Sequence, residues 1–245
     1  MNETIDILKN HRSIRKFKDE KLDQETIREL VESAQSASTS SYVQAYTIIG
    51  VTDDEKKRAL KEISTQSYVE NNGHLFVFLA DYNRHYELSK DKGTPISYDK
   101  TEQLIVGTVD ATLAAQNLAV AAESMGLGMC YIGSLRNDMG KVVEILGLPK
   151  GVIPLFGMVV GKPDHEGSRK ERLPFDVVYH ENTYKSVDKV KDDIEEYDER
   201  ISEYYKERSG GRRNDTWSDQ VIGMLSKKQR LDVDAVIKGQ GFLGQ

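Results

Sequence analysis

The chain contains a single cysteine, Cys130, among its 245 residues. One thiol cannot form an internal disulfide, and no CxxC motif or Cys/His cluster suggests a zinc site. These absences argue against a disulfide-stabilised secreted domain and against a structural metal. They favour a reducing, cytoplasmic compartment, in which Cys130 is expected to be a small buried hydrophobic residue rather than a redox thiol.

Long apolar runs are absent as well. Nowhere do about 18 apolar residues follow one another, and residues 1–17 show no apolar stretch with a cleavage site. We therefore expect neither a membrane span nor a secretion signal. The 34 Lys and Arg residues are balanced by 40 Asp and Glu residues, which leaves a net charge of -6. That balance argues against a general nucleic-acid binder, because such proteins are normally basic.

Hydrophobic patterns predict helices that alternate with strands. Residues 23–34 carry apolar side chains at helical spacing, with Asp23 as the N-cap. Two short β-branched and aromatic runs, 46–51 and 75–80, predict buried strands. Further along, the patterns predict a long helix apolar on most sides over 101–125, a strand and loop over 129–138, a short helix over 138–146 and a strand over 154–163. This order predicts an α+β fold of mixed α/β layers.

The character of the sequence changes beyond Pro174. Residues 188–213 contain 9 acidic and 7 basic side chains, yet an apolar residue recurs every three or four positions from Val190 to Tyr204. This spacing predicts one long exposed helix with a narrow apolar stripe, followed by a basic loop at Gly210. We therefore expect a body of residues 1–175 and a C-terminal extension of residues 176–245.

Two basic segments could bind a phosphate. Residues 11–17 are expected to bring Arg12 and Ser13 to one neighbourhood and to let Arg15 reach another, and residues 169–174 add further cations. Guanidinium groups and hydroxyls suit a phosphate monoester, because they donate charge-assisted hydrogen bonds. Taken alone, the first segment also fits a solvated basic helix end, and the second fits a loop that only aids solubility.

Two further segments could approach a planar ligand. Residues 38–44 are small and hydroxylated, and residues 131–134 lie where a strand ends, with Gly133 permitting close approach. The alternatives are an ordinary Ser/Thr-rich loop and a plain turn. His74, His85, His165 and His180 show no ligand spacing and are expected at the surface or as caps.

Together these segments form a recognisable set. HRSIRKF, SASTSSYVQAY, AAQNLAVAAESMGLG with YIGSLRND, PLFGMVVGKP, KERLP and YYKERSGGRRNDTWS resemble the oxygen-insensitive nitroreductase and NADPH:flavin oxidoreductase family. The resemblance is greatest to its NADPH-preferring group, which has an extra C-terminal helix. It implies a nitroreductase-like fold, with a central, mostly antiparallel sheet flanked by helices, and a homodimer with one tightly but non-covalently bound FMN in each cleft between subunits.

The resemblance also implies roles for individual residues. It assigns the FMN phosphate to His11, Arg12, Ser13, Lys170 and Arg172. It assigns Arg15 to the pyrimidine edge of the flavin, where negative charge grows on reduction, and Thr39 and Gln66 to the ribityl chain or pyrimidine. Backbone groups of Tyr131, Ile132, Gly133 and Ser134 are expected near flavin N5. Glu171 and the absence of glycines before Gln66 depart from the family pattern.

The implied reaction is a two-electron ping-pong exchange in which the flavin, and no side chain, carries the hydride. NADPH is the expected reductant, with NADH possible, and free flavins, nitroaromatics and quinones are the expected acceptors. The resemblance places Ser41 beside the nicotinamide and the NADPH 2′-phosphate near Arg208, Arg212 and Arg213. The alternative is a flavin-binding store or sensor without turnover.

Overall fold

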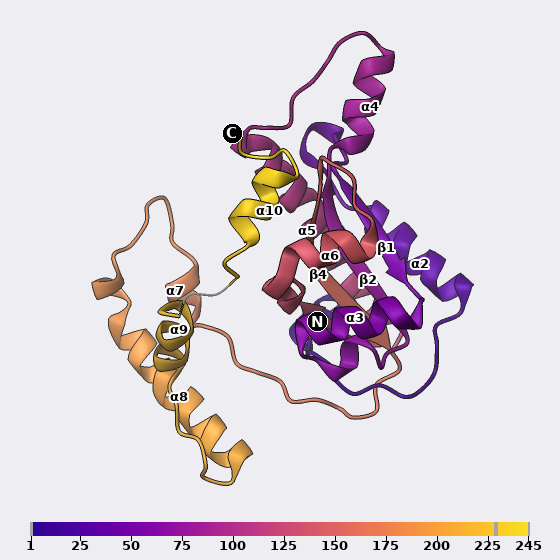
Figure 1. Ribbon diagram of the computed structural model, residues 1–245. Coiled ribbons are helices and arrows are strands. Elements are labelled where there is room, and N and C mark those ends of the chain that lie inside the picture. The colour runs from indigo at the N-terminus through magenta and orange to yellow at the C-terminus, as the bar shows by residue number, and fades with distance from the viewer. Residues whose placement is uncertain (1, 228–229, 245) are drawn as a thin grey trace. The chain divides into compact units, whose positions relative to one another are not determined.

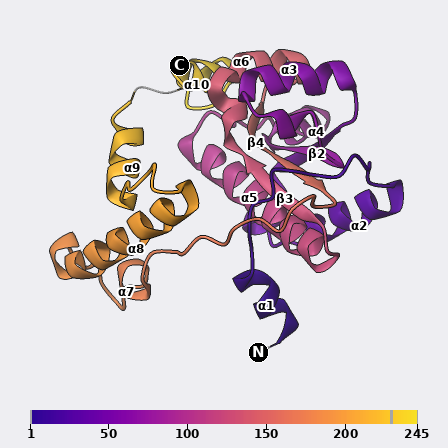
Figure 2. The same ribbon diagram turned by 90° about the horizontal axis from the view of Figure 1, so that it is seen from below.

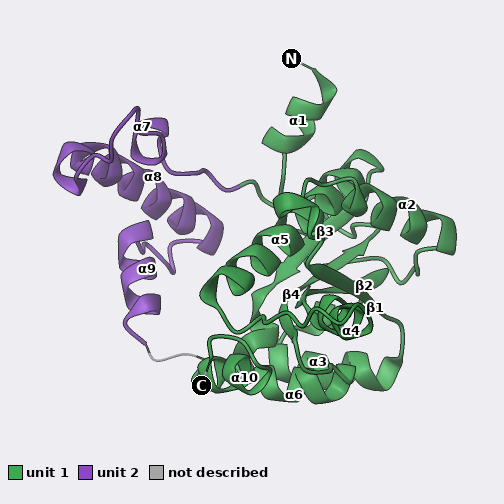
Figure 3. Ribbon diagram, turned by 90° about the horizontal axis from the view of Figure 1, so that it is seen from above, with its two compact units in different colours: residues 1–169, 230–245 green, residues 170–229 purple. Residues whose placement is uncertain are grey.

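The computed structural model describes residues 2–227 and 230–244 (Figure 1). It separates into two compact units, which are described one at a time (Figure 3). Unit 1 comprises residues 1–169 and 230–245, and unit 2 comprises residues 170–229. In the sequence, unit 2 is thus inserted into unit 1. It begins at residue 170, whereas the sequence predicted a boundary after residue 175.

A four-stranded sheet forms the centre of unit 1. Its strands are β1 (Tyr46–Val51), β2 (His74–Asp81), β3 (Gly128–Ile132) and β4 (Val152–Gly161). They lie in the order β1-β2-β4-β3, and each neighbouring pair is antiparallel. The expected antiparallel character is therefore confirmed.

Side chains of β2 alternate between two apolar layers. Phe76, Phe78 and Ala80 point to one face of the sheet, where α2 (Gln24–Gln35) and α5 (Thr101–Ser124) cover them. Leu75, Val77 and Leu79 point to the other face, where α3 (Asp54–Ser64) and α6 (Met139–Leu146) lie (Figures 1 and 2). Both faces are buried, which confirms the layered α+β fold and explains why β2 reads as one continuous apolar run.

Helix α5 is apolar on two sides for different reasons. One side packs alanines and Leu118 on the sheet, and Gly107 lies so close to it that a Cβ there would be 2.8 Å from the Cβ of Ala80. The outer side exposes Ile105, Val109 and Leu113. By length and composition, α5 is the one helix among the described residues that is apolar enough to cross a membrane, a weak signal that core helices also give.

The segment after unit 2 completes the core of unit 1. Phe242 is fully buried and packs near Tyr82 and Tyr98. Gln240 donates from Nε2 to the carbonyls of Pro149 and Val152, at 2.8 and 2.7 Å. These bonds hold α10 (Val233–Gly239) at the start of β4. The other described helices of unit 1 are α1 (Glu3–Lys9), α4 (Asn83–Asp91), η1 (Ser40–Tyr42), η2 (Ser67–Val69) and η3 (Gly133–Asp138).

Unit 2 is built on the long helix α8 (Lys191–Ser209), with α7 (Phe175–Val178), η4 (Val187–Lys189) and α9 (Trp217–Leu225). Its core consists of Tyr197, Ile201 and Tyr205, against which Trp217 packs. The predicted helix and stripe are confirmed, except that the buried face ends on Tyr205, with Tyr204 only partly buried. Gly210 ends the helix in the left-handed conformation, at φ 62°.

Candidate functional site

The basic segment 11–17 lies beyond α1, which ends at Lys9, and it is extended. Ser13 pairs with Met129 of β3, and Phe17 pairs with Pro163 just after β4. The Ile14 amide donates to the carbonyl of Met129 at 2.9 Å. The segment therefore joins the edge of the sheet, and the alternative of a solvated basic helix end is wrong.

Extended backbone sends neighbouring side chains in opposite directions. Arg12 and Ile14 lie beside Gly167, where an added Cβ would be 3.6 Å from Arg12 Cδ and 3.0 Å from Ile14 Cδ1. Ser13 and Arg15 instead lie near the thiol of Cys130. The expected pairing of Arg12 with Ser13 in one neighbourhood is therefore wrong, because Ser13 shares its side with Arg15.

Arg15 lies exposed at the sheet edge, close to Tyr68 and Cys130. It donates a hydrogen bond to Tyr68, two residues after Gln66 on η2. Burial raises the pKa of the Tyr68 phenol and of the Cys130 thiol. Cys130 is therefore a protonated buried residue, as expected.

Arg12 also lines the wall of a pocket of about 680 Å³ beside α1. His11 lies next to it and is held by Glu123 of α5, with 2.7 Å between Nδ1 and Oε1. Four carboxylates line the same pocket: Glu3, Asp6, Glu123 and Glu166. Their charge opposes a phosphate in this cavity, so a phosphate held by Arg12 needs cations from elsewhere.

Residues 131–134 lead from β3 into η3. Two arginines, Arg136 and Arg230, lie close together there. Between β2 and β4 the register shifts, which leaves Leu155 as an extra residue without a ladder partner. Arg136 donates to the Leu155 carbonyl and so satisfies it. A Cβ on Gly133 would lie 3.5 Å from Arg136 Nη2 and 3.8 Å from Arg230 Nη2.

The pair of Arg136 and Arg230 was not predicted from the sequence. Burial and the neighbouring Arg230 lower the pKa of Arg136. Within residues 2–227 and 230–244, neither guanidinium has a carboxylate within 4.0 Å. Two like charges held together without an acid favour an anionic ligand between them. The sequence offered only one sign of this pair, the single arginine of YIGSLRND, Arg136. Its partner, Arg230, lies 94 positions later.

The loop that carries Thr39 and Ser41 is strained and clamped. Ser41, Tyr42 and Gln44 have φ values of 49°, 59° and 55°, in the left-handed region. Asp110 of α5, fully buried, accepts the Ser40 amide at 2.8 Å and the Ala45 amide at 3.0 Å. A helix carboxylate thus fixes both ends of this loop, which leaves Ser41 exposed. Sequence reasoning missed Asp110, because it lies 65 to 70 positions away within an apolar helix.

In unit 2 the segment with Lys170 and Arg172 lies along α8. Lys170 donates to the hydroxyl of Tyr205 at 2.9 Å, and Arg172 donates to the Lys170 carbonyl at 2.9 Å. The carboxylate of Glu171 pairs with Arg200 at 3.1 Å, so the unusual acid is neutralised on α8. Lys170 and Arg172 are expected to bind the same phosphate as Arg12. Because Arg12 belongs to unit 1 and the other two residues to unit 2, this stays a prediction.

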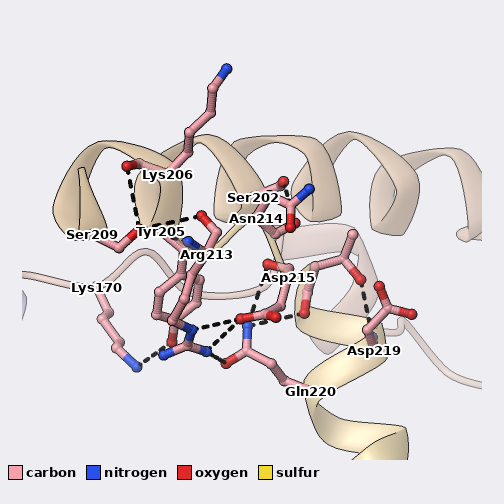
Figure 4. A network of polar contacts seen from close by, with 11 residues as sticks. Lys170, Ser202, Tyr205, Lys206, Ser209, Arg213, Asn214, Asp215, Asp219 and Gln220 are labelled. Carbon is pink, nitrogen blue, oxygen red and sulfur yellow. Dashed lines mark hydrogen bonds and ion pairs between the residues drawn. The ribbon is translucent and has the colours of Figure 1, made fainter. Parts of the chain in front are cut away.

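The three arginines around the Gly-Gly loop contact neighbours in unit 2, and Figure 4 shows those of Arg213. Arg208 donates to the hydroxyl of Tyr204 at 3.0 Å, and Arg212 donates from Nε to the Ser209 carbonyl at 2.9 Å. Arg213 is paired with Asp215. These arginines are therefore exposed and bonded to neighbours within unit 2.

Comparisons with known proteins agree with this arrangement. The model of the nitroreductase family matches residues 8–162, and that of its C-terminal domain matches residues 170–245. The chain is 52% identical to "FMN reductase (NADPH)" of Bacillus subtilis, over 99% of each chain.

Two solved structures extend the comparison. The structure of NfrA1 nitroreductase from B. subtilis superimposes with a TM-score of 0.96 at 51% identity, covering 98% of this chain and 99% of that one. The NADPH:FMN oxidoreductase of Vibrio harveyi, complexed with NAD+, gives 0.91 at 39% identity, with all of both chains covered. The match of both family models in sequence order, with full-length relatives of the same architecture, shows that the chain belongs to the nitroreductase family.

Proposed function

We propose that this protein is an FMN-containing, NAD(P)H-dependent oxidoreductase that reduces free flavins, nitroaromatics and quinones. Similar proteins bear the names FMN reductase (NADPH) and NADPH:FMN oxidoreductase. The observation that carries the proposal is the placement of Ser13 and Arg15 at the sheet edge, beside Tyr68 and the end of β3. A store without turnover is not favoured, because the relatives are named as reductases.

The donor set suits FMN, which when bound supplies the ring that accepts and releases hydride. In this proposal, Arg12 holds its phosphate together with Lys170 and Arg172, with His11 nearby, and Ser13 lies beside Arg15 on the other side of the segment. Thr39, Gln66 and the backbone of residues 131–134 hold and orient the rest. The assignment of these residues rests on the family resemblance, and the extended segment supports it by presenting Ser13 and Arg15 together.

Arg15 has an electrostatic role in this reaction. Its guanidinium would hold the pyrimidine edge of a bound FMN and would offset negative charge there. A cation about 4 Å from such a charge contributes about 4 kcal/mol at an effective dielectric constant near 20. Burial raises the pKa of the nearby Cys130 thiol, so no thiolate competes for the charge of Arg15.

The assembly is proposed to be a cytoplasmic homodimer. The outer face of α5 exposes Ile105, Val109 and Leu113, and α1 exposes Ile5 and Leu8. Exposed apolar side chains that recur along one face of a helix are typical of interfaces between subunits. The single buried cysteine supports a reducing compartment.

Anaerobic reduction of the FMN-loaded protein tests the proposed function. We expect NADPH to bleach the flavin absorbance, and an acceptor such as a quinone to restore it. Arg15→Gln is expected to slow the bleaching at least about tenfold, because the charge on the reduced ring loses its cation. Lys16→Gln, which removes an exposed charge next to it, is the matched control. A protein that takes up no FMN, or that binds FMN but is not reduced by NADPH or NADH, would contradict the proposal.

Gly128→Ala is expected to weaken FMN binding about tenfold or more while the sheet remains folded. An added Cβ would lie 2.6, 2.8 and 3.0 Å from three side-chain atoms of Ile14, which is 4% exposed. Because the Ile14 amide bonds Met129, relief of this clash displaces Ser13 and Arg15. Quenching of flavin fluorescence measures the affinity. Gly140→Ala, whose Cβ meets its nearest neighbour at 3.5 Å, is the control, and equal affinities of the two variants would refute the expectation.

A further inference from the structure

Arg213 occupies a closed internal ion pair in unit 2. Its Nε and Nη2 lie 2.7 and 2.6 Å from the same carboxylate oxygen, Oδ2 of Asp215. Its Nη2 also donates to Oε1 of Gln220 at 3.4 Å. One edge of the guanidinium fork is therefore taken by groups of the chain itself (Figure 4). That edge is one of those with which arginine binds a phosphate bidentately.

The same guanidinium stacks on Tyr205. The Cζ atom of Arg213 lies 4.3 Å from the ring centroid, and Lys170 donates to the hydroxyl of this ring. Tyr205 is buried, 9% exposed, and belongs to the core of unit 2. The guanidinium thus lies against a buried ring, while Asp215, two residues before α9, is partly exposed. The ion pair can open without disturbing the core.

Asp215 distinguishes Arg213 from its two neighbours. Arg208 and Arg212 bond to a phenol oxygen and a backbone carbonyl, and in the part of the chain that the structure describes neither has a carboxylate within 4.0 Å. An anion that approaches Arg213 therefore meets a cation that is already neutralised. It also meets the negative charge of Asp215, which repels a phosphate dianion at short range.

We propose that Asp215 sets the affinity of this protein for the NADPH 2′-phosphate, by holding Arg213 in an internal ion pair that this phosphate must open. The inference rests on the proposed function and deepens it, since it names a specificity determinant of the reductant site. Asp215 is a positioning residue that acts through Arg213. It lowers the preference for NADPH over NADH, because only NADPH has a group that competes for the guanidinium.

Asp215→Asn tests the proposal on the full chain loaded with FMN. The probes are 2′,5′-ADP and 5′-AMP, which differ by the 2′-phosphate. Exposed ion pairs are weak, so the expected gain is about two- to fivefold tighter binding of 2′,5′-ADP, with 5′-AMP unchanged. In turnover, KM for NADPH is expected to fall by the same factor, while kcat and KM for NADH stay the same.

Two further variants separate this mechanism from a general charge effect. Asp219→Asn removes a carboxylate four residues along, on α9, that bears no ion pair to a described residue within 4.0 Å, and it is expected to leave the affinity ratio of the two probes unchanged. In an Arg213→Ala background, Asp215→Asn is expected to have no effect on either probe. A gain that persists without Arg213, or a gain of equal size in Asp219→Asn, would overturn the proposal.

The outcomes also separate this inference from the proposed function. A wild-type protein that oxidises NADPH, with Asp215→Asn binding 2′,5′-ADP no more tightly than the wild type, refutes the role of Asp215 and leaves the reductase intact. A wild-type protein that holds FMN but neither binds 2′,5′-ADP nor oxidises NADPH or NADH refutes both. Stability of the ligand-free variants provides an independent check on the pair itself. The double-mutant cycle of Arg213→Ala and Asp215→Asn is expected to show favourable coupling, and its absence would overturn the proposal.

Discussion

Asp110→Asn is expected to lower the melting temperature by about 10 °C and to release the loop that carries Ser41. The Asp110 carboxylate accepts two backbone amides, those of Ser40 and Ala45, in a fully buried position. An asparagine has one acceptor oxygen, so its amide group must face the second N–H. Losing one charge-assisted bond and leaving a buried donor unpaired costs about 2–4 kcal/mol. For a chain of this size, each kcal/mol shifts the melting temperature by about 2–4 °C.

Thermal unfolding and amide hydrogen exchange measure the two effects. The amides of Ser40 and Ala45 are expected to lose protection first, because the left-handed residues between them relax once the clamp is gone. Glu102→Gln, at an exposed position of the same helix, is the matched control and should unfold at the wild-type temperature. The clamp would be disproved by an Asp110→Asn protein with wild-type stability and both amides still protected.

Stability is expected to fall by about 3 kcal/mol between pH 6.5 and pH 4 because of His74. Its side chain is 5% exposed, and burial, together with Lys57 and Lys21, lowers its pKa from 6.5 to about 4. The unfolded chain therefore binds a proton in this range that the folded chain does not, so stability is fully present above pH 6.5 and is lost as pH falls towards 4. The 2.5-unit difference corresponds to about 3 kcal/mol.

Denaturant unfolding at several pH values checks this expectation. His74→Leu removes the titrating group and is expected to flatten the pH dependence between 6.5 and 4 by that amount. His165→Leu, at an exposed position in the loop after β4, is the control and should keep the wild-type slope. A His74→Leu protein whose stability still falls as steeply as that of the wild type would show that other groups cause the loss.

The surface or capping role predicted for His74 is therefore wrong, and the reason is instructive. His74 is the first residue of β2 and lies on the same face as Phe76, with their ring centroids 4.4 Å apart. Extended alternation from Phe76 and Phe78 would have placed it inside. The prediction considered metal-ligand spacing and not the face of the strand.

Local patterns were sufficient for the helices and strands. The N-cap at Asp23, the alternation of β2 and the stripe of α8 each involve residues a few positions apart, and each is confirmed. The site depends on contacts across much longer separations. Asp110 reaches Ala45, and Arg136 meets Arg230, through the packing of helices on the sheet, which no spacing in the sequence records.

The register shift in β4 shows that a sequence pattern can also fail over a short separation. Ile153 and Leu155 face the α5 layer at odd positions, but after the extra residue Met158 and Val160 face it at even ones. A strict period of two fails across this point. The sequence predicted the strand, and only the structure shows that the unpaired Leu155 carbonyl is where Arg136 binds.

The inserted position of unit 2 has a consequence for how the protein forms on the ribosome. The four strands of the sheet have all been synthesised once the ribosome passes Gly161. Phe242, which is buried against Tyr82 and Tyr98 of unit 1, is synthesised only after the whole of unit 2. The helical insertion is therefore translated, and available to collapse on its own core, while the earlier-made unit still lacks part of its interior. Cleavage of the nascent chain after α9 would thus lower the stability of unit 1 more than that of unit 2.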